Sequence, residues 1–242
     1  MSGQTRELAV VQELIELEPR YEPSPEIASE LDNVVMGFII GPSAVGKNTI
    51  IDLVVANDNE FGRVQGFTTR PREERDSPDV YRFRDGGETG LKEVLNDVKD
   101  KKLVQYSIFP RTGYVYGSEP MDYAAPYVVM DPMASSVERL RLIPFGGIVE
   151  IGLAISGAEW IARMKERPMT PEQFRDRLYE GRYSLEWLLD QSDVLWVCNR
   201  YGLAEGVADH VKKLIRGDAT PERGVRRVGE QLLRTIMYEL SQ

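Results

Sequence analysis

Apolar residues gather in four short runs along the chain, and stretches with helical spacing lie between them. The runs are residues 34–40, 127–131, 148–155 and 194–198, of which the second ends in Asp131 and the third contains Glu150. A nearly continuous apolar run is typical of a strand that is covered on both faces, because a strand with one face in water alternates apolar and polar residues. We therefore predict an α/β fold in which a parallel sheet is flanked by helices.

Helical periodicity marks both ends of the chain and several segments between the strands. Helices are expected over residues 6–18, 47–57, 89–101 and 157–166, and in a C-terminal stretch with apolar residues at 225, 228, 232, 236 and 240. Another helix is expected to start at Thr170, because Pro171 suits a first helical turn and Gln173 completes a capping box. Residues 103–118 read as one strand followed by an aromatic, glycine-rich loop.

Composition and charge narrow the class of protein. The chain has 242 residues, 42% hydrophobic and 29% charged, which suits one α/β domain with inserted subdomains. Its formal net charge of −9 argues against nucleic-acid and anionic-membrane partners. No apolar run approaches the roughly 20 residues that cross a bilayer, and residues 1–7 lack a signal-peptide core. We expect a cytoplasmic protein, either a monomer or a homodimer.

The chain has one cysteine and one histidine. Cys198 lies in an apolar run, which predicts a buried structural thiol in a reducing compartment. His210 lies on a charged helical stretch, which predicts a surface position. Neither residue indicates a His/Cys metal site or histidine-based catalysis.

The clearest chemical motif follows the first apolar run. Residues 41–50 read Gly-Pro-Ser-Ala-Val-Gly-Lys-Asn-Thr-Ile, which gives strand, glycine-rich loop, lysine, hydroxyl and helix in the order of a phosphate-binding loop. The N–H groups of such a loop turn toward phosphate oxygens, and the helix N-terminus adds partial positive charge. The residues expected to bind a donor nucleotide here are Gly41, Ser43, Ala44, Val45, Gly46, Lys47, Asn48 and Thr49.

The motif departs from the usual pattern at one position. Serine or threonine usually follows the lysine, whereas here Asn48 follows Lys47 and Thr49 comes next. An asparagine is a weak ligand for Mg²⁺, so we assign the metal-side hydroxyl to Thr49.

A second anion site is predicted in the polar segment after the first helix. Residues 67–74 read Phe-Thr-Thr-Arg-Pro-Arg-Glu-Glu. Arginine can donate two parallel N–H groups to a phosphate, and a threonine hydroxyl can donate another hydrogen bond. The segment 113–118, Gly-Tyr-Val-Tyr-Gly-Ser, offers further hydroxyl donors.

Taken together, the motifs resemble those of the guanylate kinase family. They are Gly-Pro-Ser-x-Val-Gly-Lys at 41–47, Thr-Thr-Arg-x-Arg at 68–72, Tyr-x-Phe at 81–83 and Tyr-x-Tyr-Gly-Ser at 114–118. The resemblance covers residues 34–213 and implies a nucleoside-monophosphate-binding insert at about 65–122 and a lid at about 163–173. It leaves helical extensions at 1–33 and 214–242, which either cap the core or serve docking or dimerisation. The family uses ATP and Mg²⁺ to phosphorylate GMP or dGMP.

The resemblance also implies roles for single residues. Residues expected to contact the acceptor are Thr68, Arg70, Arg72, Tyr81, Gln105, Tyr116, Ser118 and Asp131, of which Arg70 and Arg72 hold the phosphate and Ser118 and Asp131 lie at the guanine edge. Thr49 and Asp131 are expected near Mg²⁺. The residues expected to neutralise charge during transfer are Lys47, Arg70, the lid arginines Arg163 and Arg167, and Arg177. Asn199 is expected near the adenine.

Two departures from the family leave alternatives open. The second phosphate-binding arginine comes two residues after Arg70 rather than three, so Arg72 or Arg75 fills that role. Gln105 stands where the acid that reads guanine is expected, and an amide accepts hydrogen bonds only through its oxygen. We therefore expect relaxed or altered base choice, or an acceptor such as a ribosyl phosphate. A non-catalytic partner-binding module is a further alternative, although such modules lose the lysine that stands here at Lys47.

Overall fold

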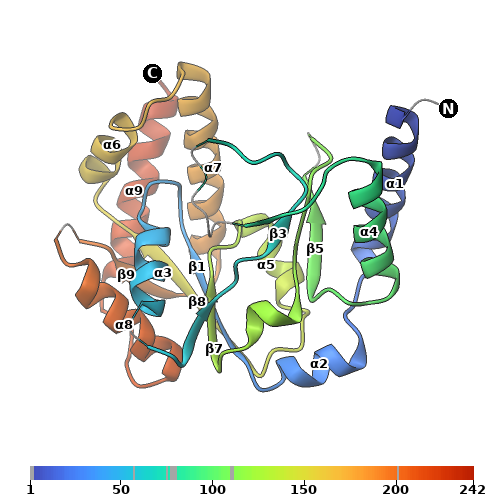
Figure 1. Ribbon diagram of the computed structural model, residues 1–242. Coiled ribbons are helices and arrows are strands. Elements are labelled where there is room, and N and C mark those ends of the chain that lie inside the picture. The colour runs from blue at the N-terminus through green and yellow to red at the C-terminus, as the bar shows by residue number, and fades with distance from the viewer. Residues whose placement is uncertain (1–2, 57, 75, 77–80, 110–111, 201) are drawn as a thin grey trace. The chain divides into compact units, whose positions relative to one another are not determined.

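The computed structural model describes residues 3–56, 58–74, 76, 81–109, 112–200 and 202–242 (Figure 1). The chain divides into two compact units. The parallel-sheet unit comprises Val35–Gly62, Ala125–Arg141 and Gly147–Gln242. The mixed-sheet unit comprises Met1–Val34, Arg63–Ala124 and Leu142–Gly146.

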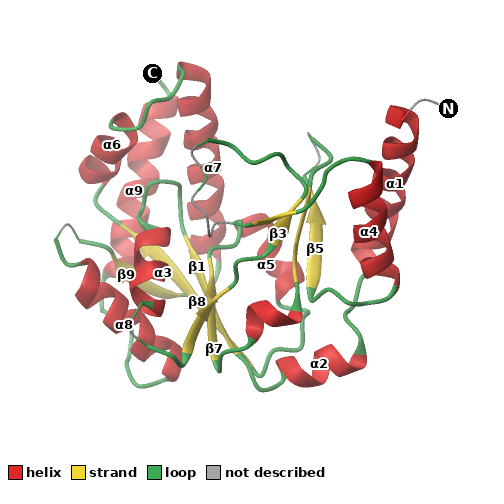
Figure 2. Ribbon diagram, viewed as in Figure 1, coloured by secondary structure: helices red, strands yellow, loops and turns green. Residues whose placement is uncertain are grey.

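The parallel-sheet unit is built on a five-stranded sheet of order β2-β7-β1-β8-β9 (Figure 2). The strands are β2 (Phe61–Arg63), β7 (Tyr127–Met130), β1 (Val35–Ile40), β8 (Gly147–Ala154) and β9 (Leu195–Cys198). Strand β1 pairs in parallel with β7 and β8, and β8 pairs in parallel with β9. Each of the four apolar runs forms one of these strands, which confirms the predicted α/β class.

Helices cover both faces of this sheet. They are α3 (Lys47–Val55), α5 (Ala134–Leu140), α6 (Gly157–Lys165), α7 (Pro171–Asp190), α8 (Ala204–Arg216) and α9 (Val225–Leu240). A Cβ on Gly37 of β1 would lie 2.6 Å from Ile215 of α8, and one on Gly152 of β8 would lie 3.3 Å from Leu188 of α7. Gly37 pairs with Val149, three residues before Gly152, and successive strand residues point to opposite faces. Helices α8 and α7 therefore cover opposite faces. Strands covered on both faces need apolar residues at nearly every position, which explains the four apolar runs.

Helix α7 begins as the sequence predicts. The Thr170 hydroxyl accepts the Gln173 N–H at 3.2 Å, and the Gln173 side chain accepts the Thr170 N–H at 3.0 Å. Helix α9 packs along α7 and against β8 and β9, with Leu232 and Ile236 fully buried. The C-terminal helix is therefore part of the core of this unit.

The mixed-sheet unit holds a four-stranded sheet of order β4-β3-β6-β5. The strands are β3 (Phe67–Thr68), β4 (Arg82–Phe83), β5 (Gln105–Ile108) and β6 (Val115–Ser118). Strand β6 runs antiparallel to both β3 and β5. The expectation of a loop at the end of residues 103–118 was wrong, because pairing on both sides makes this glycine-containing segment a central strand.

Helices α1 (Gly3–Leu17) and α4 (Glu88–Lys99) pack together in this unit, which also contains η1 (Glu18–Arg20), α2 (Pro25–Leu31) and η2 (Pro120–Tyr123). Their apolar core includes Leu14, Phe67, Val94 and Tyr106. The Tyr106 hydroxyl donates to the Leu14 carbonyl at 2.8 Å. The N-terminal helix is thus joined to the sheet by both apolar packing and a buried hydrogen bond.

A buried ion pair fixes β4 to η2. The Asp122 side chain is 2% exposed and accepts from Arg82 Nη1 at 2.6 Å and Nη2 at 2.7 Å. The backbone N–H groups of Gly66 and Glu119 also donate to it. Removing one partner of a buried, hydrogen-bonded pair costs about 3–5 kcal/mol. Arg82 is therefore a structural residue of this unit.

The environments of Cys198 and His210 differ from the expectations. Cys198 is half-buried rather than fully buried. His210 is also half-buried, and within the described chain its Nε2 atom is buried without a hydrogen-bond partner. Helix α8 packs on the sheet, so a residue on its charged stretch still loses part of its contact with water.

Candidate functional site

The loop between β1 and α3 has the backbone of an anion-binding turn. Gly46 is the N-cap of α3 with φ of 100°, and Ala44 has φ of 65°. Positive φ at alternate residues lets successive N–H groups line one concave side. A left-handed alanine costs roughly 1–2 kcal/mol, so Ala44 stores strain in the loop. Such strain typically persists at functional sites.

At both glycines of the motif, Gly41 and Gly46, neighbouring groups lie too close to the backbone for a side chain. A Cβ on Gly41 would lie 2.6 Å from the Leu153 carbonyl oxygen, which belongs to the backbone of β8. A Cβ on Gly46 would lie 2.3 Å from Asn199 Nδ2 and 3.2 Å from Arg163 Nη1. The glycines therefore serve the packing of the loop against its neighbours as well as its turn.

Three side chains hold the carbonyl groups of the loop. Trp160 Nε1 donates to the Ser43 carbonyl at 2.7 Å. Asn199 Nδ2 and Arg163 Nη1 donate to the Val45 carbonyl at 2.8 and 3.2 Å. In a trans peptide the carbonyl and the following N–H point in opposite directions. The N–H groups after Ser43 and Val45 therefore point away from these three side chains, as phosphate binding requires.

Lys47 is the first residue of α3 and folds back over the loop. Its Nζ donates to the carbonyls of Gly41 at 2.8 Å and Pro42 at 3.2 Å. Desolvation lowers the pKa of Lys47, and the charges of Asp131 and Glu180 oppose that effect. The ammonium group is thus held by neutral carbonyl oxygens. A negatively charged phosphate oxygen would attract it more strongly and can replace them.

Glu180 of α7 is a charged neighbour of the loop that the sequence does not reveal. Its Oε1 accepts from Ser184 Oγ at a long 3.5 Å. Its Oε2 is buried and lacks a hydrogen-bond partner among the described residues, although Arg177 Nη1 lies 3.8 Å away. The next residue, Gly181, would place a Cβ 3.2 Å from Pro42. Helix α7 therefore packs directly on the loop and brings a carboxylate to it.

Thr49 and Asp131 supply oxygen atoms suited to Mg²⁺. Thr49 lies in the first turn of α3, Asp131 directly follows β7, and both are exposed. Among the described residues no three His, Cys, Asp or Glu side chains form a metal cluster. Mg²⁺ usually binds one or two protein groups together with substrate phosphates and water. The Thr49 hydroxyl and the Asp131 carboxylate are oxygen ligands of the kind that Mg²⁺ prefers, so their chemistry fits a Mg²⁺ that arrives with a nucleotide.

The three arginines assigned to the donor side differ in their surroundings. Arg163 donates to the loop and pairs with Glu159 at 2.5 Å, so it already has a structural role. Arg167 reaches Ser43 Oγ at 3.5 Å. Arg177 is 53% exposed. The predicted lid, residues 163–173, spans the end of α6, its connection to α7 and the start of α7.

In the mixed-sheet unit, strand register gathers four of the predicted acceptor residues on one face. Thr68 pairs with Tyr116, and Gln105 pairs with Ser118. Directly opposed residues point to the same face, as do residues two apart on β6. The opposite face carries Phe67, which packs in the core. Thr68, Gln105, Tyr116 and Ser118 therefore share the face that turns away from α1 and α4.

Two of those four residues are enclosed. The Thr68 side chain is fully buried, and its hydroxyl accepts the Arg70 N–H at 3.3 Å. Ser118 is fully buried, and its hydroxyl bonds with that of Tyr123 at 2.8 Å. Gln105 and Tyr116 are half-buried. The contacts of Thr68 and Ser118 with an acceptor stay predictions, whereas their structural bonds are present here.

Arg70 forms a two-pronged ion pair with Asp76. Arg70 Nη1 donates to Asp76 Oδ2 and Nη2 donates to Oδ1, both at 2.7 Å. Its guanidinium carbon also lies 5.7 Å from the centre of the Tyr81 ring and 5.2 Å from that of Phe83. Hydrogen bonding with Arg70 lowers the pKa of Asp76 from its ordinary 3.8 to about 2. The Tyr81 ring in turn lies 5.7 Å from that of Tyr116.

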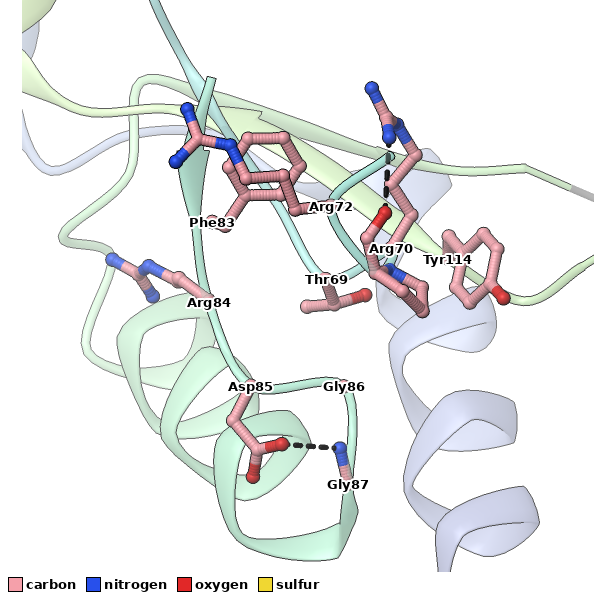
Figure 3. Close-up of a pocket in the computed structure, with 10 residues that line it drawn as sticks. Thr69, Arg70, Arg72, Phe83, Arg84, Asp85, Gly86, Gly87 and Tyr114 are labelled. Atoms are coloured by element: carbon pink, nitrogen blue, oxygen red, sulfur yellow. Dashed lines mark hydrogen bonds between the residues drawn. The ribbon is translucent and has the colours of Figure 1, made fainter. Parts of the chain in front are cut away.

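A pocket of about 400 Å³ lies beside Arg70 and Arg72 (Figure 3). The Arg72 guanidinium lies over the Phe83 ring, 5.1 Å from its centre. Across the pocket, Asp85 turns to accept the Gly87 N–H at 3.0 Å. Arg72 is thus placed beside Arg70. Arg75, the alternative second arginine, lies outside the described residues.

Sequence reasoning missed three side chains that shape these sites: Trp160, Asp76 and Glu180. No sequence signal marks Trp160 as a hydrogen-bond donor to a loop more than a hundred positions away. Asp76 lies in a highly charged stretch that reads as solvated. Asn199 was expected near the adenine, and here its amide holds the Val45 carbonyl. Its adenine contact stays a prediction.

Comparison with known proteins gives a distant structural likeness. No protein-family model matches the chain, and no curated protein matches it by sequence. Among solved structures it is similar to the guanylate kinase from Anaplasma phagocytophilum, with 14% identity over 80% of this chain and 88% of that chain, at a TM-score of 0.45. At that score the likeness establishes neither fold nor function, so both depend on this chain's own residues. No described helix is long and apolar enough for a membrane span.

Proposed function

We propose that the protein transfers the γ-phosphoryl group of ATP to a nucleoside monophosphate, with GMP or dGMP as the preferred acceptor. The observation that supports this most is the loop at residues 41–47, which has two glycines with no room for a side chain, left-handed backbone at Ala44 and Gly46, and three side chains bonded to its carbonyl groups. A loop of this kind followed by a lysine binds nucleotide phosphates.

On the donor side, the loop N–H groups and Lys47 bind the β- and γ-phosphates. Lys47 exchanges its present carbonyl partners for phosphate oxygens, which carry more negative charge. Thr49 and Asp131 would hold Mg²⁺, which supplies further neutralisation of the phosphate charge. Arg167 and Arg177 add positive charge near Lys47.

On the acceptor side, Arg70 and Arg72 hold the phosphate, and the hydroxyls of Tyr81 and Tyr116 donate to it. Arginine suits this role because its planar fork matches two phosphate oxygens. Gln105 shares a strand face with Tyr116, which supports assigning both residues to the same acceptor.

The reaction needs no covalent enzyme intermediate. An oxygen of the acceptor's phosphate attacks the γ-phosphorus, and a new P–O bond forms. The bond from the γ-phosphorus to the β–γ bridging oxygen breaks, and ADP departs with that electron pair. Catalysis then consists of alignment and charge neutralisation, with residues 163–173 closing as a lid to exclude water.

The test is an ADP-release assay with Mg-ATP and GMP, dGMP, AMP, IMP, UMP or CMP. We expect turnover to be highest with GMP or dGMP. Lys47→Ala should lose turnover by at least ~100-fold, because it removes a charge at a desolvated phosphate. Lys213→Ala is the matched control, since Lys213 is an exposed lysine of the same unit whose side chain pairs with Asp209 at the surface. Wild-type turnover by Lys47→Ala would refute the mechanism.

A second candidate, a kinase of a ribosyl phosphate, is favoured by one residue. Gln105 lacks the carboxylate that would accept two hydrogen bonds from guanine. Adding ribose phosphates to the same panel separates the two acceptors. A folded protein that binds ATP and phosphorylates nothing in the enlarged panel would instead indicate a non-catalytic binding module.

A further inference from the structure

Asp76 occupies the part of Arg70 that binds anions best. Both carboxylate oxygens face the two terminal nitrogens of the guanidinium at 2.7 Å, in the parallel arrangement that arginine also uses for phosphate. The pair is shielded, because the Arg70 side chain is 15% exposed and that of Asp76 is 9% exposed.

Asp76 is also held in place independently of Arg70. Its Oδ2 accepts the Glu73 N–H at 2.7 Å, and its own N–H donates to the Glu73 carbonyl at 3.0 Å. This local turn presents the carboxylate whether or not an anion is nearby. An acceptor phosphate and Asp76 cannot both bind the terminal fork of Arg70 at once.

We propose that Asp76 is an internal competitor for the acceptor phosphate and thereby lowers the affinity of this site for anions. The proposal rests on the proposed function, in which Arg70 holds that phosphate. A phosphate monoester carries about −1.5 to −2 at pH 7, whereas a carboxylate carries −1. A dianion therefore gains electrostatic energy when it displaces Asp76 from Arg70, and a monoanion gains none.

The opposite role for Asp76 has a distinct signature. If Asp76 only orients Arg70, a phosphate would bind the Nε side of the guanidinium while the Asp76 pair persists. Removing the Asp76 charge would then weaken phosphate binding. Competition predicts that the same change strengthens binding, so the sign of the effect decides between the two roles.

The experiment measures the affinity of inorganic phosphate at pH 8 and pH 5 by calorimetry, without ATP. Asp76→Asn should bind phosphate about 10-fold more tightly than wild type, because hydrogen bonds between charged groups are stronger than those of an amide and the amide retains only one acceptor oxygen. Both proteins should bind phosphate more tightly at pH 8, where it is a dianion, than at pH 5, because displacing Asp76 opposes both charge states equally. Glu74→Gln is the matched control, since it removes the same charge from an exposed neighbouring position.

Arg70→Ala locates the effect and separates the two proposals. The gain of Asp76→Asn should vanish in the Arg70→Ala background, because Asp76 competes only for Arg70. This control is needed since the loop at residues 41–47 is also expected to bind phosphate. If Arg70→Ala weakens phosphate binding but Asp76→Asn weakens it too or leaves it unchanged, the competitor role is wrong and the acceptor site stands. If Arg70→Ala has no effect, the acceptor assignment itself fails. Asp76→Ala, which also removes the charge, repeats the test should the asparagine variant not fold.

Discussion

Replacing Gly46 by alanine tests the geometry of the phosphate-binding loop. The new Cβ would lie 2.3 Å from Asn199 Nδ2, and the residue would keep φ of 100°. The backbone conformation alone costs roughly 1–2 kcal/mol. Displacing the Asn199 amide also breaks its 2.8 Å bond to the Val45 carbonyl, which contributes about 0.5–1.5 kcal/mol. We expect Gly46→Ala to lower the free energy of unfolding by about 2–3 kcal/mol.

The two contributions can be separated with two further variants. Gly217→Ala measures the cost of positive φ alone, because Gly217 has φ of 78° and nothing within 4 Å of an added Cβ. Asn199→Ala removes the obstructing amide and its hydrogen bond together. The double variant Gly46→Ala/Asn199→Ala should therefore be less destabilised than the sum of its parts, by about 1 kcal/mol.

The assay is urea unfolding of the four variants, followed by titration with ATP. The variants of Gly46 and Asn199 should also bind ATP more weakly, because the Asn199 amide no longer holds the Val45 carbonyl of the loop. Gly217→Ala should bind ATP as wild type does. Strict additivity of the two substitutions, or a Gly46→Ala cost equal to that of Gly217→Ala, would show that Asn199 does not contact residue 46.

Three further predictions test other parts of the molecule. Gln105→Glu should raise kcat/KM for GMP about 10-fold, because a carboxylate accepts hydrogen bonds from both guanine donors, and should leave kcat/KM for ribosyl phosphates unchanged. An unchanged kcat/KM for GMP in the acceptor panel would show that Gln105 does not contact the base. Trp160→Phe should lower stability by at least about 1 kcal/mol and raise the KM for ATP, since it deletes the bond to the Ser43 carbonyl and leaves space beside a smaller ring. Unfolding and steady-state kinetics measure both effects, and an unchanged KM for ATP would show that this bond does not shape the loop. The depressed pKa of Asp76 predicts a stabilising contribution that is present above pH 3.8 and is lost as pH falls toward about 2. The difference in unfolding free energy between wild type and Asp76→Asn should shrink over that interval, and a constant difference would contradict the ion pair.

The two predicted phosphate-binding regions, one in each unit, rest on different kinds of structural support. The loop is held by bonds from α6 and from the residue after β9, so its shape belongs to the folded core. Arg70 is held by Asp76, which lies only six residues later in the chain. Substitutions near the loop should therefore affect stability and binding together, whereas substitutions at the arginine pair should affect mainly anion binding.

The sequence by itself determined the elements whose signals are local. Short apolar runs predicted the parallel strands, and the Thr170–Gln173 capping box predicted the start of α7. The spacing of Gly41, Gly46 and Lys47 predicted an anion-binding turn. These features depend on residues close together in the chain, so their backbone preferences and apolar periodicity can be read directly from the sequence.

Only the tertiary structure decided which distant residues meet. The pairing of β6 with both β3 and β5 turned an expected loop into a central strand. The bonds of Trp160 and Asn199 to the loop join positions 117 and 154 residues apart. Hydrogen bonds and ion pairs of this kind require particular distances and angles, which follow from the packing of whole elements and leave no periodic trace in the chain.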